Sequence, residues 1–162
     1  MTISTGDRLP AGNLVKLGAN GPEQVSIEAL TKGRKVVIFA VPGAYTGTCT
    51  TAHVPSFVRT KAAFDAKGVD EVVCISVNDP FVMKAWGDVT KANEAGITMA
   101  GDASGEFTKA LGLNFDVAAA GLYGRSKRYA LYAEDGVVKV LNLEEAPGVC
   151  EISAGEVLLE AI

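Results

Sequence analysis

The sequence predicts an α/β protein in which a central mixed sheet is flanked by helices. Two observations support this fold class. Apolar runs rich in β-branched residues alternate with segments of helical periodicity through residues 36–111, which favours a mainly parallel sheet. The pattern then changes to two apolar strands joined by Glu134, Asp135 and Gly136, and Asp-Gly between two such runs is a strong hairpin signal. The chain of 162 residues has the size of one domain, so a single domain over residues 1–162 is expected.

The first clear element is the apolar run of residues 36–41, which has the composition of a strand buried on both faces. Charged residues precede this run, and Pro42 and Gly43 end it. Two weaker signals come earlier in the chain. They are a strand over residues 13–17 and a short helical turn over residues 26–30, which begins with a capping serine.

A helix is expected after the loop that follows this strand. Apolar residues recur at near-helical spacing from Ala52 to Phe64, so the polar residues 46–51 should lie at or near the helix N-terminus. The helix should end at about Lys67, because a glycine follows. Pro55 should bend it, since a proline inside a helix removes a backbone hydrogen bond.

The remaining elements are marked by apolar runs and by cap residues. Asn78, Asp79 and Pro80 form a helix-start signal, with the cap residue followed by proline in the first turn. Residues 117–124 are expected to form an apolar, flexible surface loop, and such a loop often marks a contact site. The other expected elements are strands at residues 72–77, 97–100, 128–133 and 137–143, and helices at residues 104–111 and 154–162.

Charge and composition argue against several classes of partner. The net charge is −4 and the basic residues form only short pairs or triplets, so no nucleic-acid partner is expected. No apolar run approaches the ~18 residues that span a bilayer, so no membrane association is expected. The first ten residues show no signal peptide, and the three cysteines include no close pair. A cytoplasmic location is therefore expected.

Cys49 is the strongest candidate for a reactive residue. It lies in a threonine-rich loop at the junction of the predicted strand and helix. A helix N-terminus presents unpaired backbone N–H groups and a partial positive charge, which favour an anion such as a thiolate. The thiolate is the nucleophilic form of cysteine, so Cys49 is predicted to be a nucleophile.

The motif Pro42-x-x-x-Thr46-x-x-Cys49 resembles the peroxidatic signature of peroxiredoxins, in particular the atypical peroxiredoxin-5 (type II) subfamily. The resemblance covers nearly the whole chain. This sequence departs from the family pattern at Gly47, where many relatives carry a second proline, and at Tyr45, where phenylalanine is commoner. The other matching stretches are residues 41–44, 53–55, 75–82, 101–102, 105–108, 128–130 and 135–138.

This resemblance implies a thioredoxin-like fold and a thiol peroxidase. Cys49 would attack the terminal oxygen of hydrogen peroxide or of an organic hydroperoxide and become a sulfenic acid. The family's matching positions imply that Thr46 and Arg128 donate hydrogen bonds to the leaving oxygen and that Pro42 packs over the thiolate. No cofactor is implied. Relatives in this subfamily pair through loops around the active site, which implies a homodimer.

A second function from a different class is a non-catalytic, thioredoxin-like redox sensor or binding protein in which oxidation of Cys49 changes a partner contact. Thr46 and Arg128 have no evident purpose in a sensor, so the peroxidase is favoured. The neighbouring Arg125 and Lys127 are expected to be solvated.

His53 follows Cys49 by four residues, so the two side chains would share one face of a helix. A protease dyad, a zinc half-site and a structural hydrogen bond are alternative roles for this pair. Zinc would need Cys74 and Cys150 as further ligands, although structural zinc sites usually contain close ligand pairs. No metal is therefore expected, and His53 is assigned to support of the active-site loop.

The other two cysteines have different predicted environments. Cys74 lies inside an apolar strand and is expected to be buried. Cys150 follows a loop with Pro147 and Gly148, where exposure is expected, and it falls where animal peroxiredoxin-5 proteins carry a resolving cysteine. Many bacterial and plant relatives lack this cysteine and are reduced directly by glutathione, glutaredoxin or thioredoxin. We predict a Cys49–Cys150 intramolecular disulfide, with Cys74 a less favoured partner because of its burial.

Overall fold

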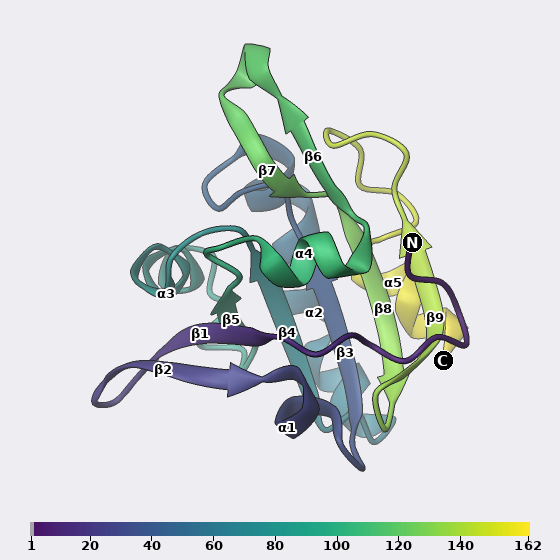
Figure 1. Cartoon of the computed structure of the whole chain (residues 1–162). Helices are drawn as coiled ribbons and strands as arrows, with labels where there is room; N and C mark the ends of the chain where they lie inside the picture. Colours follow the sequence, from purple (N-terminus) through teal and green to yellow (C-terminus); the bar gives the residue numbers. More distant parts are fainter. Residues whose placement is uncertain (1) are drawn as a thin grey trace.

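The computed structural model describes residues 2–162 and contains a mixed sheet with helices on both faces (Figure 1). The strands in this range are β1 (Asn13–Gly18), β2 (Gly21–Ser26), β3 (Lys35–Ala40), β4 (Glu71–Ser76), β5 (Thr98–Gly101), β6 (Asn114–Val117), β7 (Leu122–Ser126), β8 (Tyr129–Glu134) and β9 (Val137–Leu143). The helices are α1 (Ile27–Thr31), α2 (Val54–Ala66), α3 (Pro80–Val89), α4 (Glu106–Leu111) and α5 (Gly155–Ala161), with a π-helical turn η1 (Cys49–His53) and a 3-10 turn η2 (Ala118–Ala120). None of these helices, within the described range, has the length and apolar character needed to cross a membrane.

Within residues 2–162, seven strands form one sheet in the order β2-β1-β5-β4-β3-β8-β9, and β6 and β7 form a separate two-stranded ribbon. Strand β4 runs parallel to both β3 and β5, whereas the pairings of β8 and of β1 with their neighbours are antiparallel. This arrangement confirms the predicted mixed sheet flanked by helices. Residues 36–41, in β3 and just after it, are fully buried at 0% exposure, so the chain reaches the loop before Cys49 from the interior of the protein.

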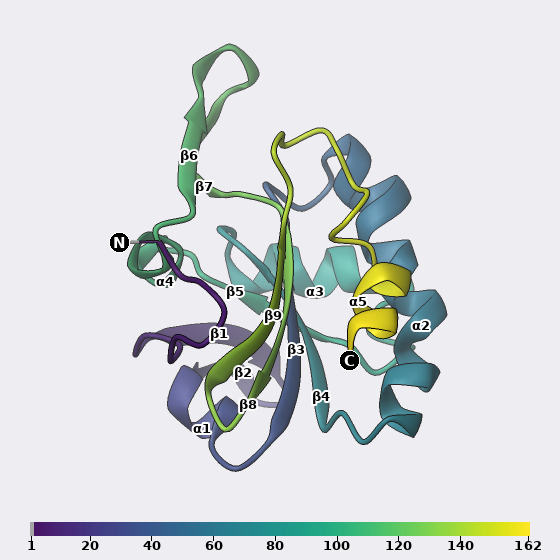
Figure 2. The same ribbon diagram turned by 90° about the vertical axis from the view of Figure 1, so that its right-hand side faces the viewer.

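Each face of the sheet has its own apolar core. Helices α2, α3 and α5 cover one face (Figure 2), where Phe57, Phe64 and Trp86 are buried. Helices α1 and α4 and the N-terminal segment cover the other face, where Leu14 and Phe107 are buried. Burial on both faces explains why β3 is an uninterrupted apolar run rather than an alternating one.

The local signals at several element ends are confirmed. The Ser26 hydroxyl accepts a hydrogen bond from Ala29 N at 3.0 Å and caps α1, and the Asp79 carboxylate accepts one from Val82 N at 2.9 Å and caps α3. The turn between β8 and β9 has positive φ angles of 49° at Asp135 and 76° at Gly136. Positive φ at both central residues is the geometry that a tight hairpin turn requires, which explains the Asp-Gly signal.

The helix after Cys49 differs from the predicted α-helix bent at Pro55. Residues 49–53 form a π-helical turn in which Val54 N donates to the carbonyl of Cys49, five residues back. Pro55 then lies in the first turn of α2, where its missing N–H breaks no established α-helical ladder. Such π-turns concentrate at functional sites, and this one sets the position of His53 relative to Cys49.

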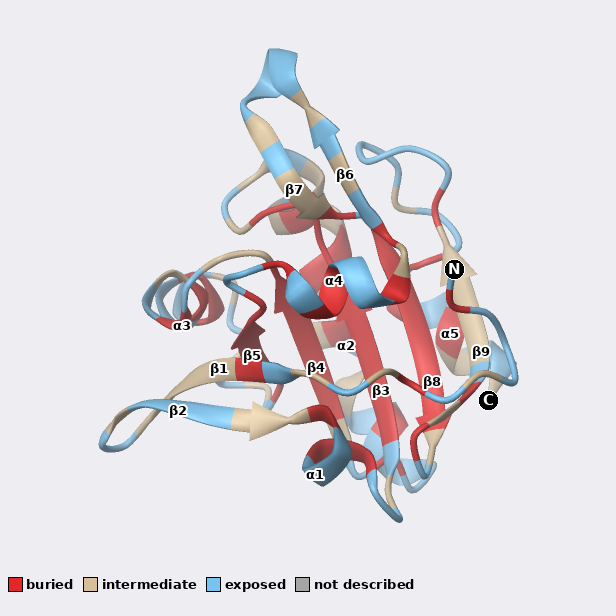
Figure 3. Cartoon of the chain, viewed as in Figure 1, coloured by how far each residue is buried: buried red, intermediate tan, exposed pale blue. Residues whose placement is uncertain are grey.

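Two segments of the sheet region were not anticipated. Residues 117–124 were expected to be a loop, but they belong largely to the β6–β7 hairpin, which projects beyond the main sheet (Figure 1). Much of this hairpin is exposed or half-buried, in contrast to the buried strands below it (Figure 3). Strand β2 was missed because its sequence, GPEQVS, has almost no apolar pattern.

Candidate active site

Cys49 lies in the first helical turn after the loop that follows β3. The chain becomes helical at Gly47, and Thr50 N donates to the carbonyl of Thr46 at 3.1 Å. The Cys49 side chain is fully buried. This position confirms that the cysteine lies at a helix N-terminus, where backbone N–H groups favour an anion.

The loop before Cys49 is fixed from two sides. Ala44 N donates to the Asn78 side chain at 3.1 Å, and Arg125 Nη1 donates to the Pro42 carbonyl at 3.2 Å. A Cβ atom on Gly43 would lie 2.7 Å from Arg125 Nη1, so a larger residue here would displace the end of the arginine side chain. Arg125 is half-buried against this loop, so the expectation that it is solvated was wrong. Pro42 is itself buried beside it.

Two donors converge on the Cys49 sulfur. Thr46 Oγ1 lies 2.8 Å from Sγ, and Arg128 Nη2 donates to Sγ at 3.2 Å. Thr46 Oγ1 also lies 2.7 Å from the Gly43 carbonyl, yet a hydroxyl carries one proton. The threonine can therefore donate to the carbonyl when the thiol is protonated and to the sulfur when it is a thiolate.

Arg128 is a buried cation just before β8, with 2% of its surface exposed. Its guanidinium donates to the Pro147 carbonyl at 2.9 and 3.2 Å, to His53 Nδ1 at 3.1 Å and to the Cys49 sulfur. Among residues 2–162, no carboxylate forms an ion pair with Arg128. A buried charge is costly unless it is paired, so the Cys49 thiolate is the anion placed to balance this guanidinium.

The hydrogen bonds of His53 define its protonation state. Arg128 can only donate, so His53 Nδ1 must accept, and Nε2 then carries the proton that it donates to the Ser153 carbonyl at 3.0 Å. Burial, followed by the charge of Arg128, lowers the pKa of His53 from 6.5 to about 3. Both ring nitrogens are engaged away from the sulfur, which argues against a protease dyad with Cys49 and supports the predicted structural role.

A second polar cluster lies behind His53, in the loop between β9 and α5. The Glu144 carboxylate accepts hydrogen bonds from Ser153 N at 2.8 Å, from Ser153 Oγ at 2.6 Å and from Glu151 N at 2.7 Å. The sequence patterns predicted no role for Glu144. No sequence signal separates it from its neighbour Glu145, because its burial depends on how the loop folds over the sheet.

The other two cysteines differ from Cys49 in their surroundings. Cys74 in β4 is fully buried, as predicted, and burial raises the pKa of its thiol well above the usual range. Cys150 is half-buried rather than exposed, because the loop packs back on the protein, and burial raises the pKa of this thiol too. Within the described range, no group of three or more His, Cys, Asp and Glu side chains is placed to hold a metal ion.

Comparisons with known proteins agree with this geometry. The model of the Redoxin family matches residues 4–158. Peroxiredoxin-2E-2, chloroplastic, from Oryza sativa subsp. japonica is 46% identical over 99% of this chain and 73% of its own length. Peroxiredoxin-2F, mitochondrial, from Arabidopsis thaliana is 50% identical over 81% of this chain and 65% of its own length. The chain is a peroxiredoxin of the redoxin family.

A solved structure supports the same assignment. Reduced Prx3 from Vibrio vulnificus in complex with hydrogen peroxide has a TM-score of 0.92 and 45% identity, and the match covers 99% of each chain. The resemblance to type II peroxiredoxins and the thioredoxin-like fold are thereby confirmed, and the enzyme is a thiol peroxidase. The expected cytoplasmic location was wrong, because Peroxiredoxin-2E-2 is a chloroplastic protein and Peroxiredoxin-2F is a mitochondrial one.

Proposed function

We propose that Cys49 is the peroxidatic cysteine of this enzyme and that Thr46, Arg128 and Pro42 complete the catalytic site. The observation that carries the proposal is the convergence of two donors on one buried sulfur, at 2.8 Å from Thr46 Oγ1 and 3.2 Å from Arg128 Nη2. Hydrogen peroxide is the first substrate to test, since a protein of 45% identity was solved with it. Alkyl hydroperoxides share the same O–OH group.

The reaction is a nucleophilic displacement on oxygen. The Cys49 thiolate attacks the terminal oxygen, the S–O bond forms while the O–O bond breaks, and the sulfur is oxidised to a sulfenic acid. The leaving oxygen departs with the electron pair of the broken bond and takes up a proton to become water or an alcohol. The Thr46 hydroxyl and the Arg128 guanidinium would stabilise the negative charge that develops on this oxygen. Pro42, which is buried in the same loop, would limit access of water to the sulfur.

His53 would support this site without touching the peroxide. As a neutral imidazole it accepts from Arg128 Nη1, which fixes the plane of the guanidinium while leaving Nη2 directed at the sulfur. A charged imidazole in the same place would repel the arginine. The low pKa of His53, about 3, keeps the ring neutral throughout the range in which the enzyme is expected to work.

The sulfenic acid is proposed to be resolved by Cys150 in the same chain. The Cys150 thiol would attack the Cys49 sulfur, forming the disulfide as water leaves. The loop of Cys150 is tied to the Cys49 region, because Thr48 Oγ1 donates to the Gly148 carbonyl at 3.0 Å and Arg128 donates to the Pro147 carbonyl. The pKa of the Cys150 thiol is raised, so local opening of the loop would be needed to make it reactive. Glutathione, glutaredoxin or thioredoxin would then reduce the disulfide.

Rapid mixing of the reduced protein with hydrogen peroxide tests the assignment of Cys49. The wild type should react far faster than a free thiol, and Cys49→Ser should lose this phase. A reaction no faster than that of a free thiol would reject the catalytic site and leave the alternative of a redox sensor.

Mass spectrometry after one equivalent of peroxide tests the resolving step. The wild type should lose two hydrogens and give a Cys49–Cys150 linked peptide, whereas Cys150→Ser should stop at the sulfenic acid. A linked peptide that contains Cys74 instead, or a wild type that stops at the sulfenic acid and turns over only with glutathione or glutaredoxin, would reject Cys150.

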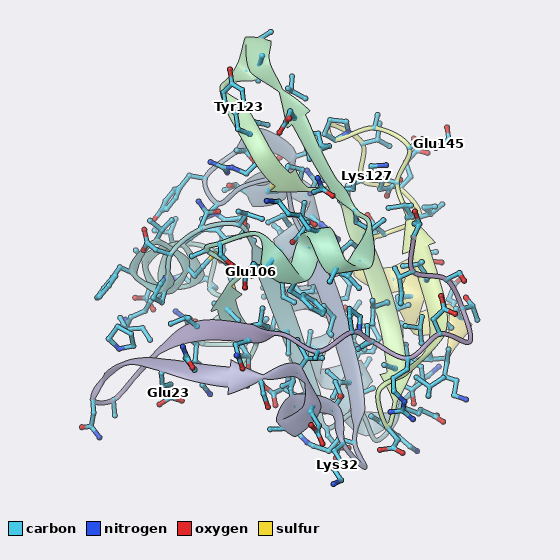
Figure 4. All side chains as sticks on the ribbon, in the orientation of Figure 1. Glu23, Lys32, Glu106, Tyr123, Lys127 and Glu145 are labelled. Carbon is cyan, nitrogen blue, oxygen red and sulfur yellow. The ribbon has the colours of Figure 1, made fainter. Side chains whose placement is uncertain are left out.

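The whole chain is proposed to form one thioredoxin-like domain that pairs as a homodimer. Large aromatic side chains are exposed in the loop before Cys49 and on the projecting hairpin, namely Tyr45 at 53% and Tyr123 at 65%. Tyr123 projects from the hairpin (Figure 4). Such exposed groups often mark interfaces. If the chain is one domain, its unfolding should follow a single cooperative transition. Light scattering at micromolar concentration tests the dimer, and Tyr123→Glu should weaken the association of the two chains. A monomeric mass for the wild type would contradict the dimer.

A further inference from the structure

Glu144 is a buried acidic residue outside the residues that contact Cys49. Its surface is 6% exposed, and its Oε2 atom accepts the three hydrogen bonds from Glu151 and Ser153 described above. These bonds hold the loop of residues 144–153 in a closed turn. A buried carboxylate satisfied by backbone N–H groups is well suited to fix a loop, because removal of the acceptor leaves those donors unpaired.

Two sets of hydrogen bonds connect this loop to the Arg128 side chain. In the first, Ser153 offers its carbonyl to His53 Nε2, and His53 Nδ1 accepts from Arg128 Nη1. In the second, the Pro147 carbonyl accepts from Arg128 Nε and Nη2. Glu144 N also donates to the Arg128 carbonyl at 3.0 Å, so the same residue holds the backbone of the arginine. Both ends of the guanidinium therefore depend on the loop that Glu144 closes.

We propose that Glu144 is a positioning residue that aims the Arg128 guanidinium at the Cys49 sulfur by closing the loop of residues 144–153. This inference rests on the proposed role of Arg128. Among the described residues, Arg128 forms no ion pair with Glu144 or with any other carboxylate. The negative charge of Glu144 is directed to donors in its own loop, which leaves the positive charge of Arg128 free for the thiolate and for the leaving oxygen.

The first test compares Glu144→Ala with Glu144→Gln. The alanine variant should slow the reaction of Cys49 with peroxide on the order of tenfold, because a small displacement of a catalytic group has a large effect on rate. It should also lose part of the far-ultraviolet thiolate absorbance that Cys49→Ser removes. The glutamine variant should restore most of both signals, since its amide oxygen can accept the same hydrogen bonds.

Glu145→Ala is the matched control. Glu145 adjoins Glu144 in sequence and has the same side chain, but it projects outward from the loop (Figure 4). This variant should react at the wild-type rate. Equal slowing by Glu144→Ala and Glu145→Ala, or no rescue by Glu144→Gln, would overturn the proposal.

A double-mutant cycle separates this inference from the function on which it rests. In an Arg128→Met background, Glu144→Ala should change the rate by less than about twofold, because residues that act through one group are not additive. An effect of Glu144→Ala that is as large without Arg128 as with it would reject the positioning role. If Arg128→Met itself leaves the rate unchanged, the proposed role of the arginine fails instead. If Glu144→Ala fails to fold, Ser153→Ala replaces it in the wild-type and Arg128→Met backgrounds. Ser153→Ala removes one of the three hydrogen bonds to Glu144, so it should slow the reaction less than loss of the whole carboxylate. This slowing should also disappear in the Arg128→Met background.

Discussion

Cys49 and Cys74 have the same side chain and the same exposure but opposite surroundings. Both are at 0% exposure and both belong to the apolar core beneath α2 and α3. The sulfur of Cys49 is within reach of Thr46 Oγ1 and Arg128 Nη2, whereas Cys74 lies in a central strand between Phe39 of β3 and Met99 of β5. Burial, followed by the charge of nearby Cys49, raises the pKa of the Cys74 thiol. The comparison shows that directed donors, and not exposure, distinguish a candidate nucleophile from an inert buried thiol.

The difference arises from where each cysteine stands on its element. Cys74 is in the middle of β4, so its backbone is paired on both sides and its side chain packs among apolar groups. Cys49 stands where a strand has ended and a helix begins, so polar side chains and free N–H groups are available. Two parts of one apolar core therefore give their thiols very different surroundings.

Removal of the cation is expected to have the largest effect. Arg128→Met keeps much of the buried volume but deletes the donor at 3.2 Å from the Cys49 sulfur. The second-order rate constant with hydrogen peroxide should fall by about a hundredfold to a thousandfold, as for loss of a donor to a developing oxyanion. Stopped-flow measurement of Cys49 oxidation checks this.

Lys127→Met is the matched control for the arginine. Lys127 precedes Arg128 in sequence, but its side chain is exposed (Figure 4). It should react as the wild type does. Equal losses in the two variants would mean that net positive charge near the site, rather than the placed guanidinium, activates Cys49.

Thr46→Val is expected to have the next largest effect on rate. The change keeps the β-branched shape and removes the hydroxyl that lies 2.8 Å from the sulfur. A hydrogen bond to a charged group contributes about 1.5–3 kcal/mol, so the rate should fall roughly tenfold to a hundredfold. Thr46→Ser should recover most of it. Peroxide kinetics that are unchanged in the valine variant would show that the hydroxyl serves the Gly43 carbonyl instead.

Much of the fold was predictable because short-range sequence signals specify several of its strands, helices and turns. The apolar run of β3, the Asp79-Pro80 helix start and the Asp135-Gly136 turn each have a short-range physical cause, and the structure confirms all three. Strand β2 and the β6–β7 hairpin lacked such signals, since they are largely polar or exposed and depend on pairing with distant or neighbouring backbone.

In the candidate site, Cys49 was predictable from its polar loop at a strand-to-helix junction, whereas the role of Thr46 came from the family resemblance. Arg128 came from the family resemblance, since its burial next to Cys49 is a tertiary fact. The roles of Ser153 and Glu144 could not be foreseen. They follow from a loop that returns to the active site from near the C-terminal end of the chain, and no pattern within that loop indicates its contacts.

The low pKa of His53 is expected to make the free energy of unfolding depend on pH in the acidic range. At neutral pH the imidazole stays neutral, so no effect on the chemistry of the site is expected. Its folded pKa of about 3 lies below the ordinary value of 6.5, so the unfolded chain binds more protons between these values. Stability from this group is therefore fully present above pH 6.5 and is lost as pH falls toward 3. Within this window the slope approaches about 1.4 kcal/mol per pH unit.

Urea denaturation of the wild type and of His53→Gln across pH measures this slope. The carboxylates titrate in both proteins and cancel in the difference, and His53 is the single histidine of the chain. The difference in unfolding free energy should be constant above pH 7 and should shift in favour of the variant as the solution becomes more acidic. Parallel curves across the acidic range would contradict a buried neutral imidazole.

Cys74→Ala is expected to have the smallest effect and tests the other side of the comparison. The change leaves a small void beside Phe39 and Met99, so the unfolding free energy should fall by about 1 kcal/mol, typical of a modest core truncation. The rate of Cys49 oxidation should stay within about twofold of the wild type, since the donors that reach the Cys49 sulfur are Thr46 and Arg128, which this substitution leaves in place. In the native wild type, an alkylating reagent at neutral pH should leave Cys74 unmodified, because its raised pKa keeps the thiol protonated and the strand keeps it inaccessible. Peptide mapping after alkylation gives this result directly.

Loss of disulfide formation in Cys74→Ala would instead assign the resolving role to Cys74. It would show that β4 can open far enough to bring Cys74 to the sulfenic acid.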